Sequence, residues 1–182
     1  KKIRKIGMMA SDTGLIHFDD VRVPQRYRIG EEGMGFTYQM QQFQEERLWA
    51  AASTLQGLNN CIQDTIGWAQ ERRLFGATLA DQQWVQFKLA EMKTEVEALR
   101  ALTYRACELY VLGDDVLEMA SMAKLKAGRT ATWVTERAIQ ILGGYGYVSD
   151  YPVERMMRDA KLTQIYEGTN QIQRIVIARN LP

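Results

Sequence analysis

Four short segments of the sequence carry polar residues that could do chemistry. The first begins at Arg72, continues through Phe75 and Gly76, and ends at Gln82-Gln83. A guanidinium at a helix end, near a glycine turn and the start of another helix, can hold a phosphate together with free backbone N–H groups. The same arginine could equally be a cationic helix C-terminus that the helix macrodipole stabilises. The residues alone leave both interpretations open.

Two further segments combine glycine with polar side chains. Gln140 precedes Gly143-Gly144, where closely spaced glycines let the backbone approach a ligand, although such a run also simply ends a helix. This run lacks the full spacing and the preceding strand of a dinucleotide-fold glycine motif. Glu167-Gly168 falls in a predicted loop, where desolvation would raise the pKa of the carboxyl group and suit it as a general base. Thr169 could instead be a plain helix N-cap beside a solvated glutamate.

The fourth segment is Glu45-Glu46-Arg47, inside a predicted helix. Adjacent acidic residues ahead of an arginine usually form a solvated helix face with local ion pairs. The one histidine, His17, lies on a predicted strand and has no assigned role. No group of Cys, His and Asp has the spacing of a metal site, so the sequence predicts no metal ligands.

The composition is that of one domain of ordinary size in a reducing compartment. With 182 residues, 46% of them hydrophobic, the chain can bury a substantial core. Its 23 basic and 22 acidic residues nearly cancel and form no basic tract, so nucleic acid is not an expected partner. No apolar run is long enough to span a bilayer, and Cys61 and Cys107 have no disulfide or CxxC spacing. We therefore expect neither membrane insertion nor disulfides.

Helices must position the four segments. Apolar residues recur at three- and four-residue steps over most of the chain, which predicts helices joined by short connections. Such helices favour an antiparallel bundle. The predicted helices run from near Gly35 to Arg72, from about Asp81 to Leu112, from caps at Asp114-Asp115 to about Leu142, from Pro152 as a short helix, and from about Thr169 to Arg179.

The first 33 residues differ from the rest. Ile3–Met9 and Gly14–Val23 are predicted strands, and proline and glycines then mark a linker. Two strands alone are marginal as a sheet, so we expect them to end a larger β domain. The predicted domains are residues 1–33, the end of that β domain and a linker, and residues 34–182, a helical bundle. The predicted fold class is all-α, an antiparallel four-helix bundle with a short N-terminal β remnant.

In order and spacing, these segments together resemble the C-terminal portion of the acyl-CoA dehydrogenases. The resemblance covers essentially the whole chain and includes Tyr151–Lys161 and Gln164–Arg174. It implies a FAD-dependent homo-oligomer, a dimer or tetramer, that oxidises an acyl-CoA thioester to the trans-2-enoyl-CoA. It also implies a missing N-terminal helical domain and most of a β domain, so the fragment is expected to be inactive alone.

The resemblance also implies roles for individual residues. Glu167 would be the base that removes the α-proton, with Gly168 and Arg47 at the acyl-CoA site. Contacts to FAD would come from Arg72 and Phe75 with Gln82 and Gln83 nearby, from Gln140, Gly143 and Gly144 reaching the FAD of a neighbouring subunit, and from Thr169 and Gln171.

Two departures from the family pattern bear on the reaction. Some members carry the base at the position of Glu46, but these generally lack a glutamate at the position of Glu167, so Glu167 is preferred. Medium-chain-like members have aspartate where this chain has Gln44, which argues against a straightforward medium-chain substrate. Residues 39–47 loosely resemble the terpenoid-type citronellyl-CoA dehydrogenases.

The family implies an electron-transferring flavoprotein as electron acceptor, and a bacterial cytoplasm or a mitochondrial matrix as location. Two alternatives remain open on the sequence. One is an acyl-CoA oxidase-like enzyme, in which oxygen reaches the reduced flavin. The other is a helical oligomerisation module without catalysis.

Overall fold

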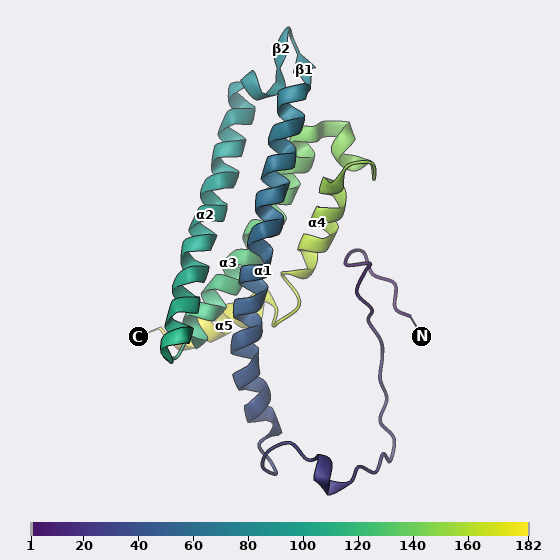
Figure 1. The fold of residues 1–182 in the computed structure, drawn as a ribbon, viewed down its shortest axis with the longest axis vertical. Coiled ribbons are helices and arrows are strands. Elements are labelled where there is room, and N and C mark those ends of the chain that lie inside the picture. The colour runs from purple at the N-terminus through teal and green to yellow at the C-terminus, as the bar shows by residue number, and fades with distance from the viewer. Residues whose placement is uncertain (1, 182) are drawn as a thin grey trace.

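The computed structural model describes residues 2–181, and helices dominate it (Figure 1). Three long helices run in antiparallel order: α1 (Gly35–Glu71), α2 (Gln83–Leu112) and α3 (Leu117–Leu142). The shorter α4 (Pro152–Leu162) and α5 (Asn170–Arg179) both pack against α3. In Figure 1, α4 runs beside the long helices and α5 crosses the lower part of the bundle. The predicted all-α antiparallel bundle is confirmed.

Small residues on α3 let the long helices come close together. The side of α3 that faces the bundle carries buried alanines, while α1 and α2 turn larger apolar side chains toward it. Small side chains on one helix and large ones on its neighbours fill a close helix interface without voids. The cluster contains Ala123, Ala127, Ala131 and Ala138 of α3, Leu55, Leu58 and Ile62 of α1, and Met92, Val96 and Leu99 of α2.

Glycine ends two of the long helices. Gly113 follows α2 with φ +84° and donates its N–H to the carbonyls at the end of the helix, a left-handed C-cap. Gly143 follows α3 with φ +62°, and Gly143–Tyr147 then forms a 3-10 helix. Gly146 packs so closely on α3 that an added Cβ would lie 2.6 Å from the Ile139 carbonyl oxygen. The chain therefore folds back tightly onto the end of α3.

A two-residue-wide hairpin joins α1 to α2. Strand β1 (Arg73–Leu74) pairs antiparallel with β2 (Ala77–Thr78). Phe75 and Gly76 make the turn, both with positive φ. Thr78 and Asp81 then form a reciprocal capping box around a short 3-10 helix before α2 begins. This hairpin is the interruption that the sequence predicts between its first two helices.

The two predicted N-terminal strands do not form, and that prediction is wrong. Within residues 2–34 the chain is irregular except for a 3-10 turn at Gln25–Tyr27. A strand needs a neighbour that bonds its backbone, and no described residue supplies one. The segment is fastened to α4 instead: Met8 N–H donates to the Asp159 carboxylate, and Arg158 donates to the Ile6 carbonyl at 2.8 Å. The division into domains at residue 33 stays a prediction.

Gly146→Ala is expected to destabilise the fold by about 1–3 kcal/mol, because the new methyl group would overlap backbone atoms of α3. Gly67→Ala, in α1, is the matched control. A Cβ at Gly67 meets nothing within 4 Å, so alanine should stabilise the helix by about 0.5–1 kcal/mol. Urea unfolding followed by circular dichroism measures both, and equal effects would contradict the close packing of Gly146.

Candidate functional site

The predicted site residues gather at two ends of the bundle. Arg47 lies in the first half of α1, whereas Arg72 directly follows its last residue. An α-helix rises about 1.5 Å per residue, so these two arginines are separated by roughly 37 Å along α1. The structure therefore sorts the candidates into two separate groups.

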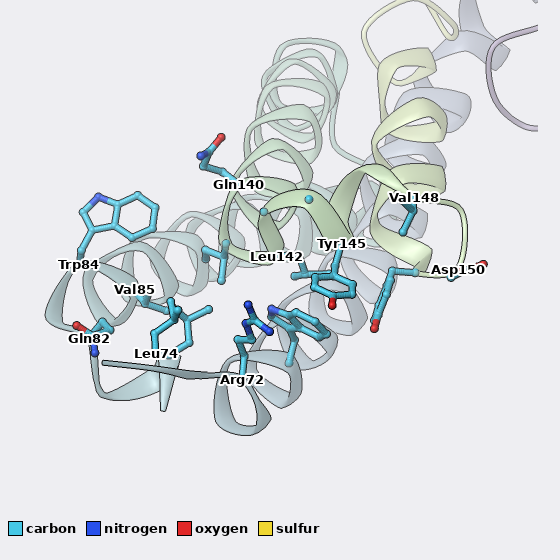
Figure 2. Close-up of a pocket in the computed structure, with 16 residues that line it drawn as sticks. Arg72, Leu74, Gln82, Trp84, Val85, Gln140, Leu142, Tyr145, Val148 and Asp150 are labelled. Carbon is cyan, nitrogen blue, oxygen red and sulfur yellow. The ribbon is translucent and has the colours of Figure 1, made fainter. Parts of the chain in front are cut away.

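One group surrounds a cavity of about 1020 Å³ at the end of the bundle where α3 finishes (Figure 2). Residues from three separate segments line it: Arg72 after α1, Gln82 before α2, and Gln140, Gly143 and Gly144 at the end of α3. The structure thus brings five of the predicted cofactor residues together. The remaining walls are Trp68, Leu74, Leu79, Trp84, Val85, Ile141, Leu142, Tyr145, Val148, Asp150 and Tyr151.

The cavity combines one cation, one carboxylate (Asp150), two amides and aromatic surface. The Arg72 guanidinium carbon lies 5.7 Å from the centre of the Tyr145 ring, and Figure 2 shows both side chains among those that line the cavity. Tyr145 also packs against Trp68, with ring centres 4.9 Å apart. Within residues 2–181 no carboxylate pairs with Arg72. An unpaired guanidinium beside amides and flat apolar walls suits a ligand that carries both phosphate and a heteroaromatic ring.

The two glycines of this cavity border open space. A Cβ added to Gly143 or Gly144 would meet no atom within 4 Å. Their backbone is therefore accessible to a ligand in the cavity. The run also ends α3, so the plain structural interpretation and the ligand-binding one are compatible here.

Phe75 and Gln83 do not line the cavity. Phe75 occupies the hairpin tip, 96% exposed and with φ +53°, a conformation that strains a residue other than glycine. Gln83 is the exposed first residue of α2. Both residues are exposed and are therefore accessible to a ligand or to another chain.

The second group is a cluster of four charged residues. Glu46 and Arg47 come from α1, Lys124 from α3, and Glu167 from the loop between α4 and α5. Arg47 and Lys124 are buried, with 5% and 1% of their surface exposed. The carboxyl group of Glu46 lies close to that of Glu167.

Burial and neighbouring charges shift the pKa values in this cluster. Burial, then the hydrogen bond and the charge of Glu46, raises the pKa of the Glu167 carboxyl, while the positive charge of Lys124 opposes this. Burial lowers the pKa of Lys124 to about 8. Burial also lowers the pKa of Arg47, against the influence of Glu46. Glu167 therefore has the environment of a general base.

Glu167 lies in a left-handed turn directly before α5. Glu167 and Gly168 have φ +52° and +82°, and this conformation costs the non-glycine residue about 1–2 kcal/mol. Thr169 is the N-cap of α5, because its Oγ1 accepts the Ile172 N–H. Its contact with a cofactor stays a prediction. Gln171 is exposed on the first turn of the helix.

Two buried residues at the Glu167 turn are absent from the predicted site. Lys124 donates from Nζ to the Gly168 carbonyl at 2.6 Å, and Gln173 donates from Nε2 to the carbonyls of Glu167 and Gly168 at 3.0 Å each. One signal in the sequence could have revealed Lys124. It falls on the same helical stripe as Ala120 and Ala127, so it places a charge on an otherwise apolar face.

Residues 2–181 contain no group of three or more His, Cys, Asp or Glu placed to hold a metal ion. Over the same range, none of the helices combines the length and the hydropathy that crossing a bilayer requires. Cys61 and Cys107 are free, and burial raises the pKa of Cys61 to about 12.

Known proteins resemble this chain in both sequence and fold. The family model described as acyl-CoA dehydrogenase, C-terminal domain, matches residues 33–181. The cyclohexane-1-carbonyl-CoA dehydrogenase of Geobacter metallireducens is 45% identical over 178 residues, 98% of this chain and 47% of the relative. The human mitochondrial short-chain specific acyl-CoA dehydrogenase is 43% identical over 181 residues, 100% of this chain and 44% of the relative.

A solved structure agrees with these matches. The butyryl-CoA dehydrogenase of Megasphaera elsdenii superposes with a TM-score of 0.95 at 42% identity, covering 98% of this chain and 47% of that one. The chain thus spans about half the length of the relatives that it matches.

Lys124 is expected to make the fold more stable as the pH rises above about 8. Its pKa is about 8 in the folded chain against an ordinary 10.5. Between these values the unfolded chain binds the additional proton, so the free energy of unfolding increases with pH through that window. Below pH 8 the lysine is charged in both states, and its contribution no longer changes.

Urea midpoints of the wild type and of Lys124→Met, measured from about pH 7 to pH 11, test this expectation. The difference between the two proteins isolates Lys124 from other titrating groups. Lys126→Met is the control, because Lys126 lies on the same helix but pairs with Glu95 of α2. If the wild type and Lys124→Met change in parallel, the lowered pKa is refuted.

Proposed function

Because the chain belongs to the acyl-CoA dehydrogenase C-terminal domain family, we propose that it supplies the general base and part of the cofactor site of a FAD-dependent acyl-CoA dehydrogenase. The proposed reaction is the oxidation of an acyl-CoA to the trans-2-enoyl-CoA. The observation that carries the proposal is the environment of Glu167, a half-buried carboxyl in a left-handed turn whose pKa is raised.

The Glu167 carboxylate is proposed to take the α-proton of the thioester. That proton is weakly acidic, so its removal needs a base with a raised affinity for protons. Burial and the nearby Glu46 provide this. The electron pair of the broken α C–H bond forms the new double bond as hydride leaves the β-carbon. Bound FAD would supply the two-electron acceptor for that hydride.

Negative charge develops on the thioester oxygen as the proton leaves, and hydrogen-bond donors stabilise it. Within residues 2–181 the Glu167 backbone N–H makes no hydrogen bond, so it is free to donate to this oxygen. Arg47 keeps its Nε and Nη1 buried without a partner among the same residues. Unpaired buried nitrogens are costly, which supports placing a polar group of the acyl-CoA beside Arg47 and Gly168.

The cavity at the other end of the bundle fits part of FAD. Its unpaired Arg72 would hold a phosphate of the cofactor, and the amides of Gln82 and Gln140 would form hydrogen bonds with polar atoms of the cofactor. The open backbone at Gly143 and Gly144 leaves room for a close approach.

The separation of the two groups supports a site that two copies share. Arg72 lies roughly 37 Å along α1 from Arg47, too far for one small cavity to include both. We infer that FAD contacts the Glu167 end of one copy, with Thr169 and Gln171, and the Arg72 end of a second copy. The outward positions of Phe75 and Gln83 support the same arrangement.

Exposed apolar residues on α2 support a homo-oligomer. Contiguous patches of exposed apolar side chains usually mark an interface, and we infer that such a patch on α2 is covered by another copy. Membership of the family further supports an electron-transferring flavoprotein as acceptor, and bacterial and mitochondrial relatives support a bacterial cytoplasm or mitochondrial matrix. The exposed residues of α2 include Trp84, Phe87, Tyr104, Val111 and Leu112.

In the FAD-loaded enzyme that contains this chain, Glu167→Gln is expected to slow flavin bleaching by acyl-CoA about 10²–10⁴-fold, since an amide cannot accept the α-proton. Stopped-flow absorbance of the flavin at saturating acyl-CoA measures the rate.

Glu46→Gln is the matched control and should keep most of the bleaching. Because it removes a charge that raises the pKa of Glu167, the acid limb of its pH profile should move to lower pH. Bleaching that survives Glu167→Gln but is lost in Glu46→Gln would move the base to Glu46.

A shared site predicts that two defective chains can complement each other. When Glu167→Gln and Arg72→Ala chains assemble together at random, about a quarter of the sites combine an intact base from one copy with an intact arginine from the other. The amplitude of flavin bleaching per protomer should recover to about that fraction of the wild type. The two variants assembled separately and then mixed serve as the control. A co-assembled sample as inactive as that control would place both groups in one copy's site.

A further inference from the structure

The left-handed turn at Glu167 and Gly168 is held by two side chains that lie outside it. Lys124 of α3 donates to the Gly168 carbonyl at 2.6 Å, and Gln173 of α5 donates to both turn carbonyls at 3.0 Å. Within residues 2–181 these carbonyls accept no backbone N–H. Lys124 and Gln173 are both buried, so water does not replace either donor. The hydrogen bonds of both turn carbonyls therefore come from these two side chains.

We propose that Lys124 is a positioning residue for the general base: its ammonium group holds the Gly168 carbonyl and thereby fixes the place of the Glu167 carboxylate. This inference rests on the proposed role of Glu167. It adds a residue from the first half of α3 to the proposed active site. Lys124 itself is not proposed to touch the substrate.

A purely structural donor at this place would not need a charge. Gln173 shows that a neutral amide can satisfy the same Gly168 carbonyl. Burying an ammonium group is unfavourable in comparison, and the lowered pKa of Lys124 reflects this. The charge gives a stronger hydrogen bond to the carbonyl. It also places positive charge close to Glu167, which an amide would not do.

Lys124 lies near the Glu167 carboxylate without forming an ion pair with it. Within residues 2–181 no carboxylate pairs with Lys124. A direct pair would favour the ionised carboxylate and weaken it as a base. The charged groups that face this cluster are Glu46 and Arg47 from α1 and Glu167 from the loop before α5. Lys124 thus offsets the repulsion between two adjacent carboxylates and leaves Glu167 free to take a proton.

Two substitutions separate the hydrogen bond from the charge in the FAD-loaded enzyme. Lys124→Met removes both, and Lys124→Gln keeps a donor but removes the charge. Lys126→Met is the matched control on the same helix, because Lys126 bonds to Glu95 of α2 and not to the turn. The rate and acyl-CoA dependence of flavin bleaching are measured against pH, together with FAD content and thermal stability.

Lys124→Met is expected to slow bleaching at saturating acyl-CoA about tenfold or more, with little change in the acyl-CoA concentration needed for half saturation, because a displaced base reacts poorly. The acid limb of the variant's pH–rate profile for bleaching should move to higher pH, since the charge that lowers the pKa of Glu167 is gone. Lys124→Gln should recover part of the rate and keep the shifted limb. Lys126→Met should match the wild type.

Amide hydrogen exchange at Tyr166 and Asn170, which flank the turn and donate to the Leu162 and Gln164 carbonyls, is a second measurement that does not depend on catalysis. It should be faster in Lys124→Met than in the wild type and unchanged in Lys126→Met. If Lys124→Met leaves both the bleaching rate and the acid limb of its pH profile unchanged, the inference is overturned. If Lys124→Met lowers only the FAD content or the thermal stability and does not move the acid limb of the pH profile, the inference is also overturned, and Lys124 is merely structural. A wild type that does not bleach would refute the proposed function, while the exchange rates would still decide whether Lys124 holds the turn.

Discussion

The close packing of α3 against its neighbours is the constraint on which the rest of the molecule depends. Alanines such as Ala127 and Ala131 remove bulk from α3 where α1 and α2 contribute large apolar side chains. Because α3 contacts α1, α2, α4 and α5, one helix sets the distance between all of them. Its end forms a wall of the cavity with Arg72, and its first half carries Lys124. Residues of both candidate regions thus belong to one helix, α3.

The sequence predicts the helices well because their causes are local. Apolar periodicity, the glycines after α2 and α3, and Pro152 at the start of α4 all act within a few residues. The predicted helix boundaries therefore lie close to the observed ones. The prediction of strands within residues 3–23 was wrong for the opposite reason. Strand pairing depends on a partner elsewhere, which local composition does not contain.

The residues of the candidate site also differ in whether local sequence or long-range contacts reveal them. Arg72, Gln82 and Gln140 were predicted from a family resemblance, since their chemistry alone left a plain structural interpretation open, and the fold brings them into one cavity. Lys124 was missed because its partner Gly168 is 44 residues away along the chain. A charge on an apolar stripe shows that something is unusual, but only the folded chain identifies the carbonyl that it holds.

The fastening of the N-terminal segment to α4 determines when parts of the molecule can form during synthesis. The hydrogen bond from Met8 to Asp159 joins residues 151 positions apart. A ribosome adds about 5–20 residues per second, so this segment waits roughly 8–30 s for its partner. The cluster around Glu167 has to wait as well, since Glu46 and Arg47 are made long before the loop that meets them. The region proposed for catalysis therefore cannot be completed until the loop between α4 and α5 has been made.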